Sequence, residues 1–248
     1  MLILVFARLM KEGWITVGEI EGMNEDKIAK MKESMEEILY KGANEINVSL
    51  TPKEIELFKT YLMELKRWGS KTNITAIHDN LEIVIKHFID SLSPLKYIPQ
   101  GSSLLDIGSG GGFPGIPLKI ANPSLDVTLL DSTLKKVNFQ KHIIRLLHFN
   151  KIKALHGRAE DKDMHGKIGS TFDVVISRAF SGLGKFLAIG EPYLKRGGVL
   201  IAMRGREAKR ELTDNEEILI HLRLAVVDIV EFYLPYLSEK RSLIVFSR

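Results

Sequence analysis

A glycine-rich turn at residues 106–115 constrains the fold of this 248-residue chain more than any other stretch. The turn reads DIGSGGGFPG and directly follows the apolar residues 103–105. Glycine adopts backbone conformations that other residues avoid, so such a turn lets a ligand approach the main chain where a strand ends. The pattern therefore predicts a nucleoside-binding turn between the first strand of a parallel sheet and the following helix.

Short apolar runs alternate with helical patterns from residue 99 onward. We expect strands at 103–107, 127–131, 152–155, 172–177, 198–203, 224–234 and 242–246. Helices are expected near 117–121, over 134–147, around 183–194 and over 206–221. This alternation predicts right-handed βαβ units on a parallel sheet. Because a parallel crossover needs about a dozen residues, the last two strands, joined by a turn, must pair antiparallel.

The first hundred residues have a different texture, with helical patterns at 26–40, from Thr51 onward and over 81–92. Gly42 is expected to end the first helix, and Thr51, Pro52 and Glu54 form a capping box that begins the second. We therefore predict a helical subdomain over 31–98 and a ligand-binding domain over 99–248. Residues 1–30 have little periodicity and are interpreted as an extension, with Met31 and Met35 as candidate true starts.

Composition narrows the class of protein. The chain has no cysteine, which excludes a disulfide framework and Cys-ligated metal sites and suits a reducing compartment, so we expect a cytoplasmic protein. Its formal charge of +4 permits a nucleic-acid partner. The apolar run at 2–7 is too short for a signal core or a membrane span, and no membrane partner is expected.

Two cofactors compete for the glycine turn. Residues 110–115 fit the GxGxxG string of NAD sites, whereas a P-loop is excluded because no Gly-Lys-Ser/Thr follows. Three features favour S-adenosylmethionine. Asp106 offers an acceptor for the ammonium group of the methionine end, and Pro114 and Pro117 remove N–H groups that a pyrophosphate needs. The reversed last strand is the third, because it is typical of methyltransferase sheets.

Two further segments suit the nucleoside. Asp131 ends the second strand, where a carboxylate can accept both ribose hydroxyls; the alternative is a cap for the helix that starts near Thr133. Residues 157–161 follow the third strand, where an adenine-contacting loop would lie, or else form a solvated polar turn.

Six ordered motifs carry a resemblance to a known family. They are Arg67-Trp68-x-x-x-x-Asn73-Ile74-Thr75, His87-x-x-Asp90-Ser91, residues 106–115, Leu130-Asp131-Ser132, Arg158-Ala159-Glu160 and Ser177-Arg178-Ala179. Together, over about 35–248, they resemble the GidB/RsmG family of bacterial methyltransferases, which methylate N7 of a guanine in small-subunit (16S) ribosomal RNA. The resemblance implies a Rossmann-like class I α/β fold, with a mostly parallel seven-stranded sheet, an antiparallel last strand and an N-terminal helical subdomain.

The resemblance also implies a site. The residues expected to bind S-adenosylmethionine are Gly108, Gly110, Phe113, Asp131, Ala159, Glu160 and Arg178. Two positions depart from the family's pattern. Gly69 stands where asparagine is frequent, and Arg204-Gly205 stands where Lys-Gly is usual. Arginine and lysine are not equivalent at a site of defined geometry.

Guanine N7 carries an in-plane lone pair, so in-line displacement on the sulfonium methyl needs no general base. Positioning groups are therefore sought first, and Arg178 and Arg204, at the ends of the fourth and fifth strands, are the candidates for the guanine's O6 edge or its phosphates. The alternative for both is a salt bridge on the sheet rim. His87 and Asp90 share a helix face, but without a third ligand no metal site is expected.

Basic residues spread over the second half are candidates for contact with ribosomal RNA or the 30S particle. They are Lys135, Lys136, Lys141 and Arg145 on one helix, and Lys195, Arg196, Arg206, Lys209 and Arg210 near the fifth strand. Two other functions stay open at this stage: an NAD-dependent oxidoreductase and a non-catalytic RNA-binding module. The sequence does not fix the oligomeric state.

Overall fold

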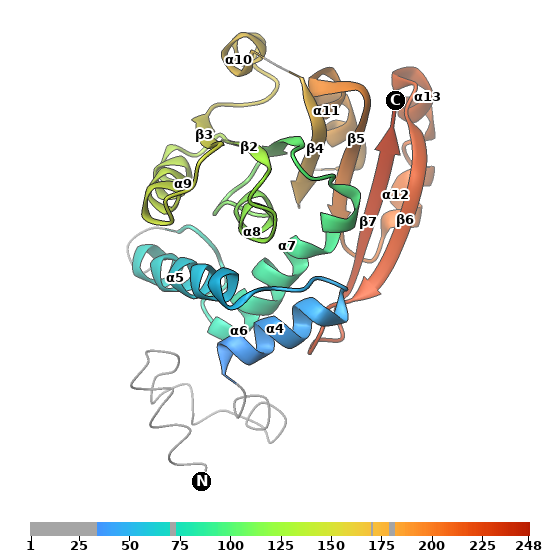
Figure 1. Cartoon of the computed structure of the whole chain (residues 1–248). Coiled ribbons are helices and arrows are strands. Elements are labelled where there is room, and N and C mark those ends of the chain that lie inside the picture. The colour runs from blue at the N-terminus through green and yellow to red at the C-terminus, as the bar shows by residue number, and fades with distance from the viewer. Residues whose placement is uncertain (1–33, 70–72, 170, 179–181) are drawn as a thin grey trace.

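The computed structural model describes residues 34–69, 73–169, 171–178 and 182–248 (Figure 1). The extension predicted over 1–30 lies outside the described residues, as does the predicted start of the first helix before Ser34. Ala179, the last residue of the sixth motif, also lies outside them. The proposed division of the chain at 98/99 stays a prediction.

Seven strands form one mixed sheet in the order β3-β2-β1-β4-β5-β7-β6 (Figure 1). They are β1 (Ser103–Ile107), β2 (Asp126–Asp131), β3 (Ile152–His156), β4 (Phe172–Arg178), β5 (Leu194–Arg204), β6 (Ala225–Tyr233) and β7 (Lys240–Ser247). The first five pair parallel, and β7 runs antiparallel to both β5 and β6. The fold class and the antiparallel last pair are therefore confirmed.

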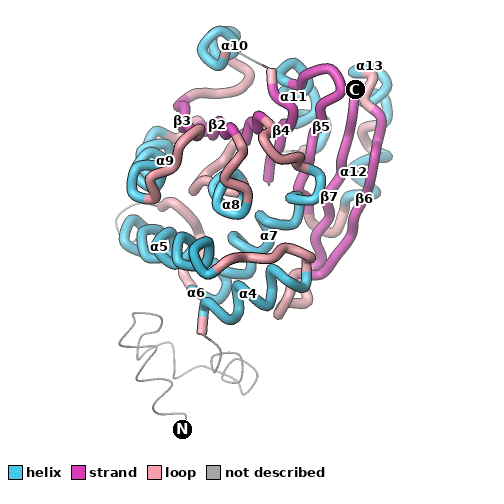
Figure 2. Tube along the Cα trace, in the orientation of Figure 1, coloured by secondary structure: helices cyan, strands magenta, loops and turns pink. Residues whose placement is uncertain are grey.

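Helices cover both faces of this sheet (Figure 2). Those before β1 are α4 (Met35–Glu45), α5 (Pro52–Gly69), α6 (Asn80–Ile83), η1 (Val84–Ile89), α7 (Asp90–Leu92) and η2 (Ser93–Tyr97). Those after β1 are α8 (Gly115–Ala121), α9 (Leu134–Leu146), α10 (Lys162–Ile168), α11 (Leu183–Gly190), η3 (Glu191–Tyr193), α12 (Ala208–Thr213) and α13 (Glu216–Leu222).

Each strand divides its apolar side chains between the two faces, as the pleat requires. Leu104, Val174 and Ile176 face the core that includes α4, α5, η1, α8 and α9, whereas Leu105 and Val175 face α10, α11 and α12. Among the described residues, no helix is both long enough and apolar enough to cross a membrane.

Two sequence expectations about helices are corrected, and one helix was not expected. Gly42 does not end the first helix, which continues to Glu45. The glycine instead permits close packing against Ile89, with which a side chain at position 42 would collide. The helix expected over 206–221 is two helices, interrupted at 214–215, where the Asn215 amide donates to the Glu211 carbonyl 2.7 Å away. Helix α10 was not expected, because its sequence is short and polar.

The capping box predicted at the start of α5 is present. The Thr51 hydroxyl accepts from the Glu54 amide at 3.3 Å, and the Glu54 carboxylate accepts from the Thr51 amide at 2.6 Å. A second box, formed by Ser34 and Glu37, begins α4. Helices α6, η1, α7 and η2 follow one another directly from Asn80 to Tyr97, and η1 is a π-helical turn.

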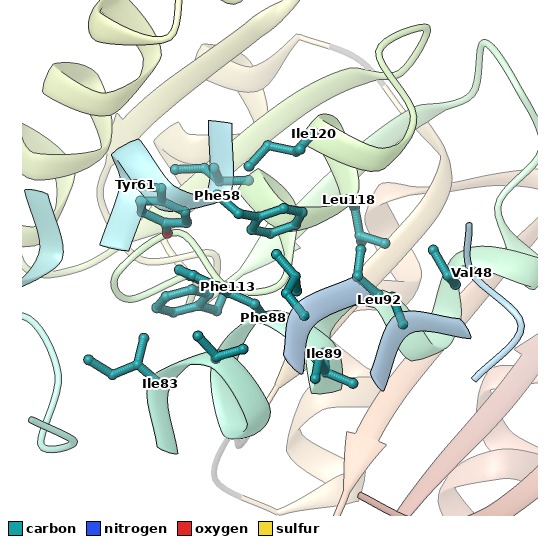
Figure 3. Packing of buried hydrophobic residues seen from close by; sticks show 14 of the residues in the cluster. Val48, Phe58, Tyr61, Ile83, Phe88, Ile89, Leu92, Phe113, Leu118 and Ile120 are labelled. Atoms are coloured by element: carbon teal, nitrogen blue, oxygen red, sulfur yellow. The ribbon is translucent and has the colours of Figure 1, made fainter. Parts of the chain in front are cut away.

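Aromatic side chains join these N-terminal helices to the glycine turn (Figure 3). Tyr61 of α5 lies 5.3 Å from Phe88 of η1 and 5.5 Å from Phe113 of the turn, measured between ring centroids. Phe58 packs on Phe88 at 5.0 Å. The helical layer and the turn are therefore parts of one continuous core, which fixes the position of η1 relative to the ends of the strands.

Candidate functional site

The glycine turn is held in place by backbone and side-chain contacts from three sides. The Gly108 amide donates to the Leu130 carbonyl at 2.8 Å, and the Gly110 amide donates to Asp131 Oδ2 at 2.8 Å. Gly112 has a φ of +102°, and a Cβ there would lie 2.4 Å from Ile116 Cδ1. Only glycine fits at that position, so this tight turn requires the residue found there.

Asp106 lies beneath the turn, fully buried. Its Oδ2 accepts a hydrogen bond from the Gly115 amide at 2.8 Å. Its Oδ1 has no hydrogen-bond partner among the described residues. Burial raises the pKa of Asp106 to about 7, because the charged form loses its hydration. A buried, unsatisfied acceptor is costly and calls for a donor.

Two residues that sequence reasoning missed also hold the turn. The Tyr61 hydroxyl donates to the Gly111 carbonyl at 2.5 Å. Gln140 of α9 is fully buried, and its amide donates to Ser109 Oγ at 2.8 Å and to the Gly110 carbonyl at 2.7 Å. A glutamine among the polar residues of an amphipathic helix gives no signal of such a role, because only the tertiary fold brings it to the turn.

A cleft of about 180 Å³, here called the small cleft, opens beside the ends of β1 and β2. Its lining residues are Ile107, Gly108, Leu130, Asp131, Ser132, Gly157, Arg158, Ala159, Glu160 and Lys185. Four of the predicted cofactor residues, Gly108, Asp131, Ala159 and Glu160, are thus brought together, and Gly110 is bonded to one of them. Two carboxylates, Asp131 and Glu160, lie beside two cations, Arg158 and Lys185, and Lys185 pairs with Glu160 at 3.3 Å. The carboxylates and the backbone groups can accept from the hydroxyl and amino donors of a nucleoside.

Asp131 has two roles in the structure. Its Oδ2 receives the Gly110 amide and its Oδ1 receives the Thr133 amide at 2.8 Å, so it holds the turn and the residue before α9, although no side chain caps that helix. The same carboxylate lines the small cleft. Because each carboxylate oxygen has more than one acceptor direction, this bonding leaves capacity for ribose hydroxyls.

A second cleft of about 710 Å³, the large cleft, lies at the ends of β4 and β5. Its lining residues are Ile77, Lys86, His87, Asp90, Arg178, Gly182, Met203, Arg204, Gly205, Glu211 and Arg241. Since β1 pairs with β4, the two clefts occupy neighbouring positions along the carboxyl edge of the sheet. Such an edge is where open α/β sheets bind ligands.

Arg178 organises the large cleft. Its Nη1 donates to the Lys86 carbonyl at 2.7 Å and lies 3.5 Å from Asp90 Oδ2, and its Nη2 lies 3.0 Å from His87 Nδ1. Its guanidinium also lies 5.0 Å from the centre of the Phe113 ring. Neither Arg178 nor Phe113 lines the small cleft. Arg178 lines the large cleft and Phe113 belongs to the turn, so their contact joins the two, and the predicted contact of both residues with the cofactor stays a prediction.

His87 and Asp90 are fixed by Arg178 and do not bond to each other in the contacts of the described residues. Burial lowers the pKa of His87 to about 3, and the Arg178 charge adds to this, so the imidazole is neutral at physiological pH. Its Nε2 lies 2.7 Å from Thr75 Oγ1. Asp90 is buried between Arg178 and Arg241, and no group of three metal-binding side chains occurs in the described ranges.

Arg204 forms a salt bridge, which was the alternative to its predicted contact with the guanine, and that contact stays a prediction. Its side chain is only 7% exposed, and its Nε donates to Glu211 Oε2 at 2.8 Å, with Nη2 bonded to the same oxygen. The pair lies in the wall of the large cleft. Trp68, near the end of α5, packs edge-on against Phe139 at 5.5 Å.

The basic residues expected near the fifth strand do not form one surface. Lys195 and Arg196 lie at the start of β5, and Arg206, Lys209 and Arg210 follow its end. An eleven-residue strand separates them, so only the second group shares the edge of the sheet with the two clefts.

The fold and the neighbouring clefts define a class I S-adenosylmethionine-dependent methyltransferase. The structure is similar to the tRNA methyltransferase TrmK of B. subtilis (TM-score 0.52, 17% identity, 64% of each chain). It is also similar to a SAM-dependent methyltransferase from Aquifex aeolicus (TM-score 0.51, 16% identity, 67% of this chain and 93% of that one). These likenesses show that the chain has the class I methyltransferase fold.

Sequence comparison names the family. The GidB family model, described as rRNA small subunit methyltransferase G, matches residues 54–243. Ribosomal RNA small subunit methyltransferase G of Geobacter sp. (strain M21) is 43% identical over 88% of this chain and 100% of that relative. The protein of that name from Thermoanaerobacter sp. (strain X514) is 38% identical over 88% of this chain and 92% of its own. The chain belongs to the GidB family, and its cofactor is S-adenosylmethionine.

Proposed function

We propose that the chain transfers the methyl group of S-adenosylmethionine to N7 of a guanine in small-subunit ribosomal RNA. The observation that carries this proposal is the pair of neighbouring clefts, one lined by Gly108 of the turn with Asp131 and Glu160, and one rich in cations. The first suits a nucleoside donor and the second suits a phosphate-bearing acceptor. The relatives named above are described as small-subunit ribosomal RNA methyltransferases, which agrees with this assignment.

The residues present fit the cofactor. Asp131 and Glu160 supply carboxylates for hydroxyl and amino donors of the nucleoside, and the unsatisfied Oδ1 of Asp106 supplies an acceptor for the ammonium group of the methionine end. When bound, the cofactor supplies an electrophilic methyl group on a sulfonium. The small cleft alone is below the range of about 300–1,000 Å³ that is usual for ligand pockets, so it would hold only the nucleoside end.

The reaction needs orientation more than proton transfer. Guanine N7 attacks through an in-plane lone pair, so no proton leaves the attacking atom. His87, neutral because its pKa is lowered to about 3, and Asp90, enclosed by two guanidiniums, agree with a site that has no general base. Holding two reactants in line can supply roughly 7–11 kcal/mol of the barrier in ideal cases. Arg178 would provide this positioning through its fixed place beside the turn.

Mapping N7-methylguanine in ribosomal RNA from a strain that lacks the gene tests the proposal. We expect one position in small-subunit RNA to lose its methyl group, and a plasmid carrying the wild-type gene to restore it. Unchanged N7 methylation at every position would contradict the proposal. Binding of the purified protein to small subunits should also weaken steeply with salt, whereas a flat dependence would favour a small-molecule acceptor.

A further inference from the structure

Both members of the Arg204–Glu211 pair line the large cleft, and Glu211 is the more exposed of the two. Arg204 is 7% exposed and Glu211 is 28% exposed, and the contacts that Nε and Nη2 of Arg204 make with Glu211 go to a single carboxylate oxygen, Oε2. Two donors on one oxygen fix the position of the carboxylate and leave acceptor capacity on the group. Arg204 therefore orients Glu211 and is itself poorly placed to read a base.

The Glu211 carboxylate is unusual in the wall of the large cleft, because most of the charged side chains that line this cleft are positive. Lys86, Arg178 and Arg241 line the same cleft, and of the two acids that line it Asp90 is only 6% exposed. Glu211 is therefore the carboxylate that a ligand in this cleft can reach. It would repel phosphate and would attract a neutral group with N–H donors.

We propose that Glu211 determines specificity for guanine by accepting hydrogen bonds from the N1–H and N2–H groups of the base, an inference that rests on the proposed function. Among the four bases only guanine presents these two donors side by side. Adenine has a lone pair at N1, which a carboxylate repels. The donors lie on the Watson–Crick edge, away from N7, so binding them leaves N7 free to face the methyl group. Ile77 and Met203 add apolar surface to the same cleft.

The experiment compares guanine with inosine, whose base lacks the N2 amino group. Small subunits are reconstituted from ligated ribosomal RNA that carries either nucleotide at the guanine identified by the deletion-strain mapping. Methyl transfer is followed in single turnovers with enzyme in excess, so that slow rates are still measured. The enzymes are the wild type, Glu211→Gln and a control, Glu217→Gln, which removes an exposed carboxylate on α13 outside the large cleft.

We expect the wild type and Glu217→Gln to methylate guanine about tenfold faster than inosine, in line with the discrimination that a good bidentate contact gives. Glu211→Gln should be slower on guanine and should treat the two bases alike, while its affinity for S-adenosylmethionine, measured by calorimetry, stays within about twofold because Glu211 does not line the small cleft.

Equal wild-type rates on guanine and inosine would overturn the inference without reference to any variant. A Glu211→Gln enzyme that keeps the wild-type ratio would overturn it as well and would leave Glu211 a structural partner of Arg204. Absence of wild-type transfer to guanine would instead refute the proposed function, so the two failures are distinguishable.

Discussion

The small cleft and the large cleft lie next to each other at the carboxyl edge of the sheet, but different chemical groups line them. The small cleft is shaped by main-chain groups of the turn and by Asp131, which is bonded to that main chain. The large cleft is shaped by long side chains, with Arg178 at its centre. A ligand that is the same in every turnover suits a site held by the main chain of a turn, whereas a charged macromolecule suits a site lined by cationic side chains.

The comparison predicts that substitutions on the two sides separate cofactor binding from methyl transfer. A substitution in the small cleft should weaken binding of S-adenosylmethionine. One in the large cleft should slow transfer to RNA more than it weakens that binding.

The largest effect is expected for Arg178→Ala. Methyl transfer should fall by about a hundredfold or more, because the group that positions the acceptor side is lost, and affinity for S-adenosylmethionine should fall less than about tenfold. The free energy of unfolding should drop by about 3 kcal/mol, at the low end for a broken buried pair, because Asp90 keeps Arg241. Transfer assays, calorimetry and urea unfolding measure the three quantities. Equal losses in binding and transfer would place Arg178 functionally with the small cleft.

Asp131→Asn should weaken S-adenosylmethionine binding by roughly ten- to a hundredfold, since hydrogen bonds to a charged group contribute about 1.5–3 kcal/mol. Binding to small subunits should not change. The matched control is Asp126→Asn at the opposite, exposed end of β2, which should leave both affinities unchanged. Calorimetry with each ligand gives the result, and an unchanged cofactor affinity in Asp131→Asn would leave Asp131 only its bonds to the Gly110 and Thr133 amides.

For Asp106 we expect a smaller effect, in which stability and cofactor affinity both depend on pH. Burial raises its folded pKa to about 7, above the unfolded value, so the unfolded chain ionises first and stability falls as pH rises from about 4 to about 7. The ionised carboxylate is the form that attracts the ammonium group. Affinity for S-adenosylmethionine should therefore rise about fivefold between about pH 6 and pH 7.

Asp106→Asn is the matched comparison for that pH dependence. The asparagine variant should lack both the fall in stability and the rise in affinity, because it has no carboxylate to ionise. Unfolding curves and calorimetry at several pH values provide the two measurements. A wild-type affinity that is independent of pH would show that Asp106 only supports Gly115.

Tyr61→Phe should have the smallest effect. It removes the donor to the Gly111 carbonyl and so leaves a buried acceptor unsatisfied, which costs about 1–3 kcal/mol of stability. Cofactor affinity should fall about threefold as the turn loosens. The control is Tyr97→Phe, whose hydroxyl bonds to Asp228 away from both clefts. If chemical unfolding gives equal stabilities for the two variants, the Tyr61 hydroxyl does not stabilise the glycine turn.

The two clefts also differ in how far the sequence predicts them. The glycine turn, Asp131 and the 159–160 pair follow strand ends that local patterns locate, so the small cleft could be predicted before the structure. The large cleft joins η1, β4, β5, α12 and β7, and Glu211 and Arg241 carry no local signal because only tertiary packing brings them together. Gln140 escaped prediction for the same reason. Arg204 was placed correctly at the end of β5, but its partner could not be read from spacing alone.

Transfer of label from S-adenosylmethionine to isolated small subunits tests the central claim most directly. Subunits from a strain lacking the gene are incubated with purified enzyme and methyl-tritiated cofactor, and the RNA is digested to nucleosides. The two-cleft account predicts about one methyl group per particle, all of it in N7-methylguanosine, with Arg178→Ala slower by the factor given above. Failure to label the RNA, or label in any other nucleoside, would contradict it.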